Sequence, residues 1–189
     1  EMKDLGIEIR LNTEITDISG LNADEIIVAT GSKPRKLRVK GAEKGIEACD
    51  YLYGNKEVGQ KVIVIGGGLS GCEIALDLYL KGKTPVIVEM KNDLIAMKGV
   101  CLANSSYLRD FFALNKVEVH LNTALCEITD DGVRVKDKEG KEFDIDGDSV
   151  ILSVGYIPEP VAPEGKNVHL VGDCNGIGNL RTVIWRAWE

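Results

Sequence analysis

The sequence has no long apolar run, no closely spaced cysteine pair and no excess of positive charge. No apolar run approaches the roughly 20 residues that a membrane-spanning helix needs, and residues 1–4 lack the pattern of a signal peptide. The net charge of −7 and the pI near 5.0 argue against nucleic acid or an anionic membrane as a partner, because an acidic surface attracts neither. We therefore expect a soluble, cytoplasmic protein.

The cysteine pattern argues against a metal or redox site. The 5 cysteines are far apart, and no two form a Cys-x-x-Cys motif. We interpret them as reduced thiols. Cys72 lies in an apolar helical pattern, which is typical of a small buried side chain. No His or Arg lies within a few residues of Cys174 to activate it. We assign no catalytic residue and no metal site.

One pattern occurs twice in the chain. Residues 7–13 recur as residues 117–123, and each copy continues to an apolar run that ends at a glycine, Gly31 in one copy and Gly155 in the other. Only the second copy is preceded by a strand pattern that leads into a glycine-rich turn. We infer two related dinucleotide-binding units, one complete and one without its beginning. We therefore expect the chain to be a fragment of a longer protein.

Periodicity predicts an α/β fold. Wholly apolar runs favour strands buried on both faces of a parallel sheet, and they lie at residues 26–29, 62–65, 86–88 and 150–152. Helical spacing predicts helices at 69–81, at about 105–115 and from about Leu180. Alternating patterns predict a three-stranded antiparallel meander, with strands at 125–129, 133–137 and 142–146.

The predicted architecture is a Rossmann-like, three-layer βαβ domain with an antiparallel β-meander. We expect it to comprise residues 59–147. Residues 1–58 and 148–189 would be two segments of an incomplete second Rossmann-like domain, which the chain visits before and after the complete one.

The glycine turn predicts a phosphate site. Gly66-x-Gly68-x-x-Gly71 follows an apolar strand and opens a helix, which is the context that a dinucleotide-binding fingerprint requires. Gly66 permits the tight turn, Gly68 lets the backbone approach a pyrophosphate, and Gly71 lets helix and strand pack closely. The N–H groups and the positive dipole end of the helix then attract phosphate. We assign NAD binding to the turn, at Gly66, Gly67, Gly68, Leu69, Ser70 and Gly71.

Glu89 ends the next predicted strand, where a carboxylate can accept hydrogen bonds from both hydroxyls of the adenosine ribose. The alternative is a solvated loop carboxylate. The Glu89 carboxylate would repel the 2′-phosphate of NADPH by a few kcal/mol at an effective dielectric constant of about 20. We therefore predict that the site binds NADH rather than NADPH. Met90 and Lys91 belong to the same predicted site. Lys91 could reach a phosphate, although we favour a surface lysine.

Three other strand ends carry small or acidic residues. Ala29-Thr30-Gly31 and Val154-Gly155 close strands where backbone could pass close to a nucleotide, and either could be an ordinary turn. Gly172-Asp173 follows a later strand. Its carboxylate would suit a ribityl or ribose hydroxyl, or it could cap a helix.

The order of these motifs resembles the pyridine-nucleotide reductases with two dinucleotide-binding domains, over essentially the whole chain. The sequences GGGLSGCE at 66–73, ATG at 29–31, VGYIP at 154–158 and VGDC at 171–174 look like signatures of that family. The glycine motif and GDC are most similar to the C-terminal part of 2-enoate reductase and 2,4-dienoyl-CoA reductase.

The resemblance implies particular roles for residues of this chain. The second, incomplete domain would be of the FAD type, with FAD contacts from Ala29, Thr30, Gly31, Gly172 and Asp173. Glu73 would lie near the nicotinamide and the flavin. Gly155 and Tyr156 would border the nicotinamide.

The resemblance also implies a flavin-dependent NADH oxidoreductase that reduces an enoate or dienoyl-type double bond. In such enzymes NAD(P)H reduces FAD, and electrons cross an iron–sulfur cluster to FMN, which reduces the double bond. The FAD glycine motif, the FMN-binding barrel and the cluster cysteines are missing from this sequence. We therefore expect the isolated chain to bind NAD(H), to retain no stable FAD and to have negligible turnover.

Two alternatives stay open. The chain could be an NAD(H)-binding module without turnover, or it could belong to a disulfide-reductase-type flavoenzyme whose cysteine pair lies elsewhere. We also expect self-association, because strands 26–29 and 150–152 and the tail at 183–188 would expose apolar surface and sheet edges without the missing half.

Overall fold

The computed structural model describes residues 1–96 and 99–188, and its contacts divide the chain into two compact units. The larger unit is Pro34–Gly155, and the smaller one is formed by the segments before and after it. These limits differ from the expected domain of residues 59–147. The larger unit extends further in both directions because β3 (Ile46–Glu47) and β10 (Ser149–Leu152) join its central sheet.

The central sheet of the larger unit has five strands in the order β3-β10-β4-β5-β6, and every neighbouring pair is parallel. The other three strands are β4 (Lys61–Ile65), β5 (Thr84–Val88) and β6 (Glu118–His120). The apolar residues of β4, β5 and β10 are buried, which confirms the parallel strands predicted from their composition. The expectation that strand 150–152 exposes apolar surface and a sheet edge is wrong, because Val150, Ile151 and Leu152 are buried and β10 lies between β3 and β4.

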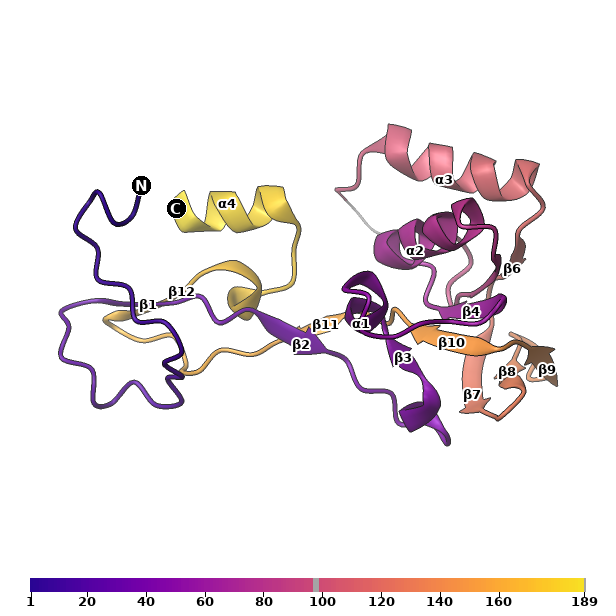
Figure 1. The fold of residues 1–189 in the computed structure, drawn as a ribbon, viewed down its shortest axis with the longest axis horizontal. Coiled ribbons are helices and arrows are strands. Elements are labelled where there is room, and N and C mark those ends of the chain that lie inside the picture. Colours follow the sequence, from indigo (N-terminus) through magenta and orange to yellow (C-terminus); the bar gives the residue numbers. More distant parts are fainter. Residues whose placement is uncertain (97–98, 189) are drawn as a thin grey trace. The chain divides into compact units, whose positions relative to one another are not determined.

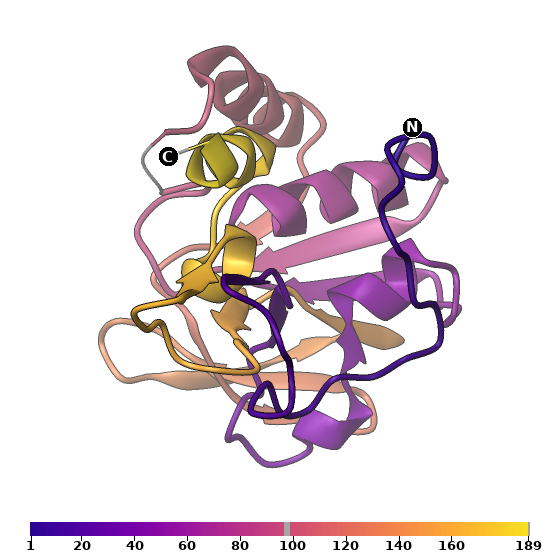
Figure 2. The same cartoon turned by 90° about the vertical axis from the view of Figure 1, so that its left-hand side faces the viewer.

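Helices cover one face of this sheet (Figures 1 and 2). They are α1 (Ala48–Leu52), α2 (Leu69–Leu80) and α3 (Leu102–Leu114). Their buried side chains, among them Leu78 of α2 and Phe112 of α3, pack in one cluster with Val64 and Ile87 of the sheet. The predicted helix at 69–81 is confirmed, and α3 begins earlier than the expected residue 105.

The antiparallel meander covers the opposite face. Its strands are β7 (Ala124–Ile128), β8 (Gly132–Lys136) and β9 (Glu142–Asp146), in that order. Val133 and Val135 of β8 are buried against sheet residues such as Ile63 and Val86, whereas the alternate residues Arg134 and Lys136 face water. The predicted three-layer architecture with a meander is therefore confirmed. A short 3-10 turn, η1 (Ala42–Lys44), precedes β3.

The order of the strands places a topological switch point at the carboxyl end of β4. From β4 the chain proceeds to β5 and β6 on one side, and it returns after the meander to β10 on the other side of β4. In open parallel sheets, ligands bind outside the carboxyl ends of the strands where the order reverses in this way. The turn that follows β4 contains the three spaced glycines, so the fold puts them at this switch point.

In its described residues the smaller unit contains two short strand pairs and one α-helix. The pair β1 (Ile26–Val28) and β12 (Val168–Leu170) is parallel. The other elements are β2 (Ser32–Pro34), which pairs with β11 (Tyr156–Pro158), the 3-10 turn η2 (Gly172–Asn175) and α4 (Leu180–Trp188). The sequence repeat is not matched in structure, because residues 117–123 include β6 whereas residues 7–13 form no strand. A strand forms only beside another strand. In the described part of the chain β1 pairs with β12 alone, so residues 7–13 have no place beside it in a sheet.

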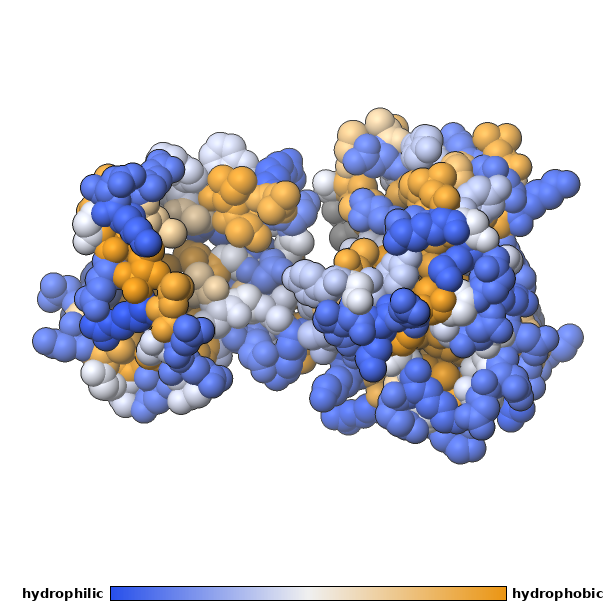
Figure 3. Space-filling view, viewed as in Figure 1, coloured by the Kyte–Doolittle hydropathy of each residue, from blue (hydrophilic) through white to orange (hydrophobic). Residues whose placement is uncertain are grey.

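Helix α4 has no buried residue, and more than half of the surface of Leu180, Ile184, Trp185 and Trp188 is exposed. Figure 3 shows apolar side chains gathered over this helix. Self-association through such surface stays a prediction. None of the helices in the described part of the chain is both long enough and apolar enough to span a bilayer.

Candidate dinucleotide-binding site

The glycine turn after β4 packs so closely that two of its glycines admit no side chain. A Cβ atom on Gly66 would overlap the carbonyl oxygen of Ser153, and Gly66 has a φ of +105°. A Cβ atom on Gly71 would overlap the carbonyl oxygen of Gly66. These contacts agree with the expected roles of Gly66 in a tight turn and of Gly71 in helix packing.

Gly68 differs from Gly66 and Gly71, because neither its backbone conformation nor the packing around it requires a glycine. It is the N-cap of α2 with φ −69° and ψ −178°, a conformation open to any residue. A Cβ atom on Gly68 would meet no other atom within 4 Å. The space beside this backbone is therefore open at the start of a 12-residue helix. The first N–H groups of a helix have no partners within it and attract anions.

Glu89 is held at the same turn by backbone N–H groups. Its Oε2 accepts a hydrogen bond from the Gly67 N–H at 2.6 Å, and its Oε1 accepts one from the Lys91 N–H at 2.8 Å. The residue is only 8% exposed, so it is not the solvated loop carboxylate considered as the alternative. Each carboxylate oxygen has a second acceptor site, which leaves capacity for two ribose hydroxyls.

The remaining residues predicted to contact NAD lie around this turn or follow nearby strands. Leu69 is half-buried at the start of α2, whereas Ser70 and Glu73 are exposed on that helix. Met90 and Lys91 are exposed in the loop after β5, and the Lys91 Nζ contacts the Ala96 carbonyl at 3.4 Å. Two further predicted residues follow β10, namely Gly155, exposed with a φ of +87°, and Tyr156, which begins β11 and belongs to the smaller unit.

The residues with predicted FAD contacts all lie in the smaller unit. Ala29 is exposed, and the Thr30 hydroxyl donates to the Glu159 carbonyl at 2.8 Å. The Gly31 carbonyl accepts a hydrogen bond from the Glu159 N–H at 3.1 Å. These bonds hold the end of β1 beside the segment that follows β11.

Asp173 lies in η2, which begins at Gly172 with a φ of +71°. Its carboxylate accepts hydrogen bonds from the Gly178 N–H at 3.1 Å and from the Ser32 hydroxyl at 3.5 Å. The start of α4 is capped instead by Asn179, whose side-chain oxygen accepts from the Thr182 N–H at 3.1 Å. The alternative role of Asp173 as the cap of this helix is therefore wrong.

Cys72 is a buried structural side chain. It is fully buried in α2, and its Sγ lies 3.5 Å from the Gly67 carbonyl oxygen. Burial, with a smaller contribution from the negative charge of Glu89, raises the pKa of the Cys72 thiol to about 12. The thiol therefore stays protonated at neutral pH and is a poor nucleophile. No group of three potential metal ligands occurs within residues 1–96 and 99–188.

Comparison with known proteins identifies the family of this chain. A family model described as pyridine nucleotide-disulphide oxidoreductase matches residues 19–178. The chain belongs to this family. The resemblance stated from the motifs is thereby confirmed, and the fold of this pyridine nucleotide-disulphide oxidoreductase chain agrees with that of its relatives.

Several relatives of this oxidoreductase chain are much longer proteins. Cinnamate reductase of Clostridium sporogenes is 42% identical over 196 residues, which cover all of this chain and 29% of that protein. NADH oxidase of Thermoanaerobacter brockii is 33% identical, with 100% and 31% covered. The structure of a 2-naphthoyl-CoA reductase complex superposes with a TM-score of 0.81 at 28% identity, covering 99% of this chain and 30% of that one. The chain thus spans about 30% of the length of these relatives.

Proposed function

We propose that this chain is the NAD-binding part of a flavin-dependent NADH oxidoreductase. The observation that carries the proposal is the open space at Gly68, where the turn tolerates a side chain sterically but has none. This space lies at the N-terminus of α2 and at the switch point of the sheet. A glycine without a packing role at such a position is explained by close approach of a diphosphate to the backbone.

Each part of the turn would have one task in binding NADH. The N–H groups at the start of α2 would bind the diphosphate, and they let an acidic protein hold an acidic ligand. The two oxygens of Glu89, already oriented by the Gly67 and Lys91 N–H groups, would accept the ribose hydroxyls. Gly155 and Tyr156 would border the nicotinamide, and Glu73 would lie near it. The bound cofactors supply hydride transfer from NADH to FAD.

We propose that FAD is bound only partly by this chain. Thr30 and Gly31 follow β1, and Asp173 lies in η2. The resemblance of the chain to the pyridine-nucleotide reductases implies that these residues contact FAD. The sequence has one Gly-x-Gly-x-x-Gly turn, at Gly66, and our proposal gives it to NADH. The diphosphate of FAD would then need residues outside these 189. On this proposal the isolated chain binds no stable FAD and has negligible turnover.

The proposed substrate of the complete protein is an enoate or a related activated double bond. Support comes from the relative named cinnamate reductase and from the structural neighbour named 2-naphthoyl-CoA reductase. In this proposal, FMN and an iron–sulfur cluster would be bound outside this chain.

An anaerobic experiment on the complete flavoprotein tests this proposal. We expect added NADH to bleach the flavin absorbance and a subsequent enoate such as cinnamate to restore it. A flavin that NADH does not reduce would overturn the proposed function. Reduction by NADH without reoxidation by any enoate would contradict the substrate class alone.

NADH is expected to bind at least about tenfold more tightly than NADPH, because the 2′-phosphate would face the Glu89 carboxylate. Calorimetric titration of the full chain with each nucleotide measures this ratio. Lys91→Ala is the matched control, because it removes the nearby cation and keeps the N–H that binds Glu89. The ratio should be unchanged in this variant. Tighter binding of NADPH would contradict the role of Glu89, and a ratio altered by Lys91→Ala would show that the Lys91 side chain reaches the 2′-phosphate.

A further inference from the structure

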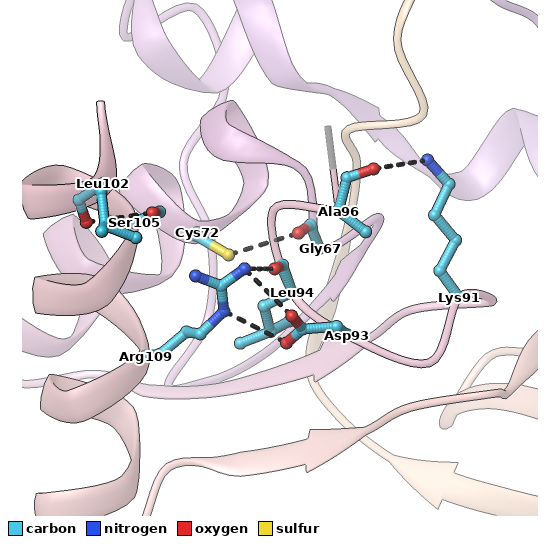
Figure 4. A network of polar contacts seen from close by, with 9 residues as sticks. All are labelled: Gly67, Cys72, Lys91, Asp93, Leu94, Ala96, Leu102, Ser105 and Arg109. Atoms are coloured by element: carbon cyan, nitrogen blue, oxygen red, sulfur yellow. Dashed lines mark hydrogen bonds and ion pairs between the residues drawn. The ribbon is translucent and has the colours of Figure 1, made fainter. Parts of the chain in front are cut away.

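Arg109 of α3 forms a fork of hydrogen bonds with the loop that follows β5 (Figure 4). Its Nε and Nη2 donate to the two carboxylate oxygens of Asp93 at 3.1 and 3.0 Å. The same Nη2 donates to the Leu94 carbonyl oxygen at 2.5 Å. The guanidinium thus binds a side chain and the adjacent backbone at once, which fixes the geometry of the loop.

The loop held by Arg109 supports the glycine turn directly. Leu94 and Ile95 are 5% and 3% exposed, and both belong to the buried cluster that includes Cys72 of α2. The Ile95 N–H donates to the Gly67 carbonyl oxygen at 2.7 Å. A Cβ atom on Gly67 would lie 2.6 Å from the Leu94 Cδ2, which shows how closely the two residues pack. Gly67 is therefore bound through its carbonyl to this loop and through its N–H to Glu89.

Ile95 adopts a conformation that its neighbours must maintain. Its φ is +53°, in the left-handed region that a β-branched residue rarely enters. Such strain persists only where surrounding contacts over-determine it. The bond from Arg109 to the carbonyl of the preceding residue, Leu94, is one of these contacts.

We propose that Arg109 is a positioning residue for the dinucleotide site. Through Asp93 and Leu94 it holds Ile95 in the conformation in which the Ile95 N–H fixes the Gly67 carbonyl, and with it the turn and Glu89. The inference rests on the proposed NADH site. The side chains of Arg109 and Asp93 are partly exposed, and a partly exposed ion pair contributes little to the free energy of unfolding. The effect of Arg109 is therefore expected in NADH binding and in the local order of the loop.

The test compares two similar forks in the same unit. Arg109→Gln removes the proposed brace, and Asp93→Asn is a second variant that weakens it. Arg134→Gln is the matched control, because Arg134 makes an equivalent fork to Asp144 across the meander, at 2.8 and 3.2 Å. Two quantities are measured for the full chain: the NADH dissociation constant by calorimetry, and the exchange rate of the Ile95 amide proton by NMR without nucleotide.

We expect Arg109→Gln to weaken NADH binding about fivefold and to accelerate exchange of the Ile95 amide about tenfold. Asp93→Asn should produce smaller changes in the same directions, and Arg134→Gln should change neither quantity. An unchanged NADH dissociation constant, or an unchanged Ile95 exchange rate, in both loop variants overturns the inference. Absence of NADH binding by the unmodified chain would refute the proposed function and, with it, this role of Arg109.

Discussion

Replacing Gly71 by alanine is expected to lower the free energy of unfolding by about 3 kcal/mol or more. The added Cβ would overlap the Gly66 carbonyl oxygen, and no side-chain rotation can relieve the overlap because the backbone fixes the position of both atoms. The helix would have to move from the strand it packs on, which disturbs the buried cluster around Cys72 and Leu78. Urea denaturation followed by circular dichroism measures the change.

The matched control for this variant is Gly68→Ala. Gly68 has an ordinary φ of −69°, and a Cβ there would meet no atom within 4 Å. Its free energy of unfolding should change by no more than about 1 kcal/mol, the usual range for an N-cap substitution. Equal losses of stability in the two variants would contradict the packing described for Gly71.

Gly68→Val is expected to weaken NADH binding by about 100-fold or more while the chain stays folded. The branched side chain would fill the space in which we place the diphosphate, and it would keep the phosphates from the first N–H groups of α2. Calorimetric titration with NADH measures the loss. Circular dichroism verifies that the fold is retained.

Gly20→Val is a suitable control for the added bulk. Gly20 lies in the smaller unit, and a Cβ atom there would also meet nothing within 4 Å. NADH affinity should be unchanged in this variant. Unimpaired binding by Gly68→Val would show that the open space is not the diphosphate site, and the proposed function would lose its main support.

Much of the larger unit could be predicted from sequence because its pattern of burial is unusually clear. Strands covered on both faces are apolar at nearly every position, as β4 and β5 are, whereas β8 alternates because one face meets water. The glycine turn was recognisable because its spacing follows such a strand. Glu89 was identified by its place at the next strand end.

Other features could not be predicted because they depend on contacts distant in sequence. An apolar run indicates burial but does not identify the neighbouring strands, so the sequence does not predict that β10 lies between β3 and β4. The left-handed conformation of Ile95 is imposed by its surroundings, since isoleucine does not favour it. Arg109 and Asp93 carry no motif, and only the structure shows that they meet. The sequence does not predict the hydrogen bond from the Gly67 N–H to Glu89 for the same reason.

The position of β10 beside β4 also bears on how the chain folds during synthesis. Ser149–Leu152 form one whole side of the strand that precedes the glycine turn, and Ser153 touches the turn itself. A nascent chain that has emerged only as far as β9 would carry the complete fingerprint next to an unpaired sheet edge. Because a domain generally folds as a unit, the glycine turn reaches its final packing only after the ribosome has released β10.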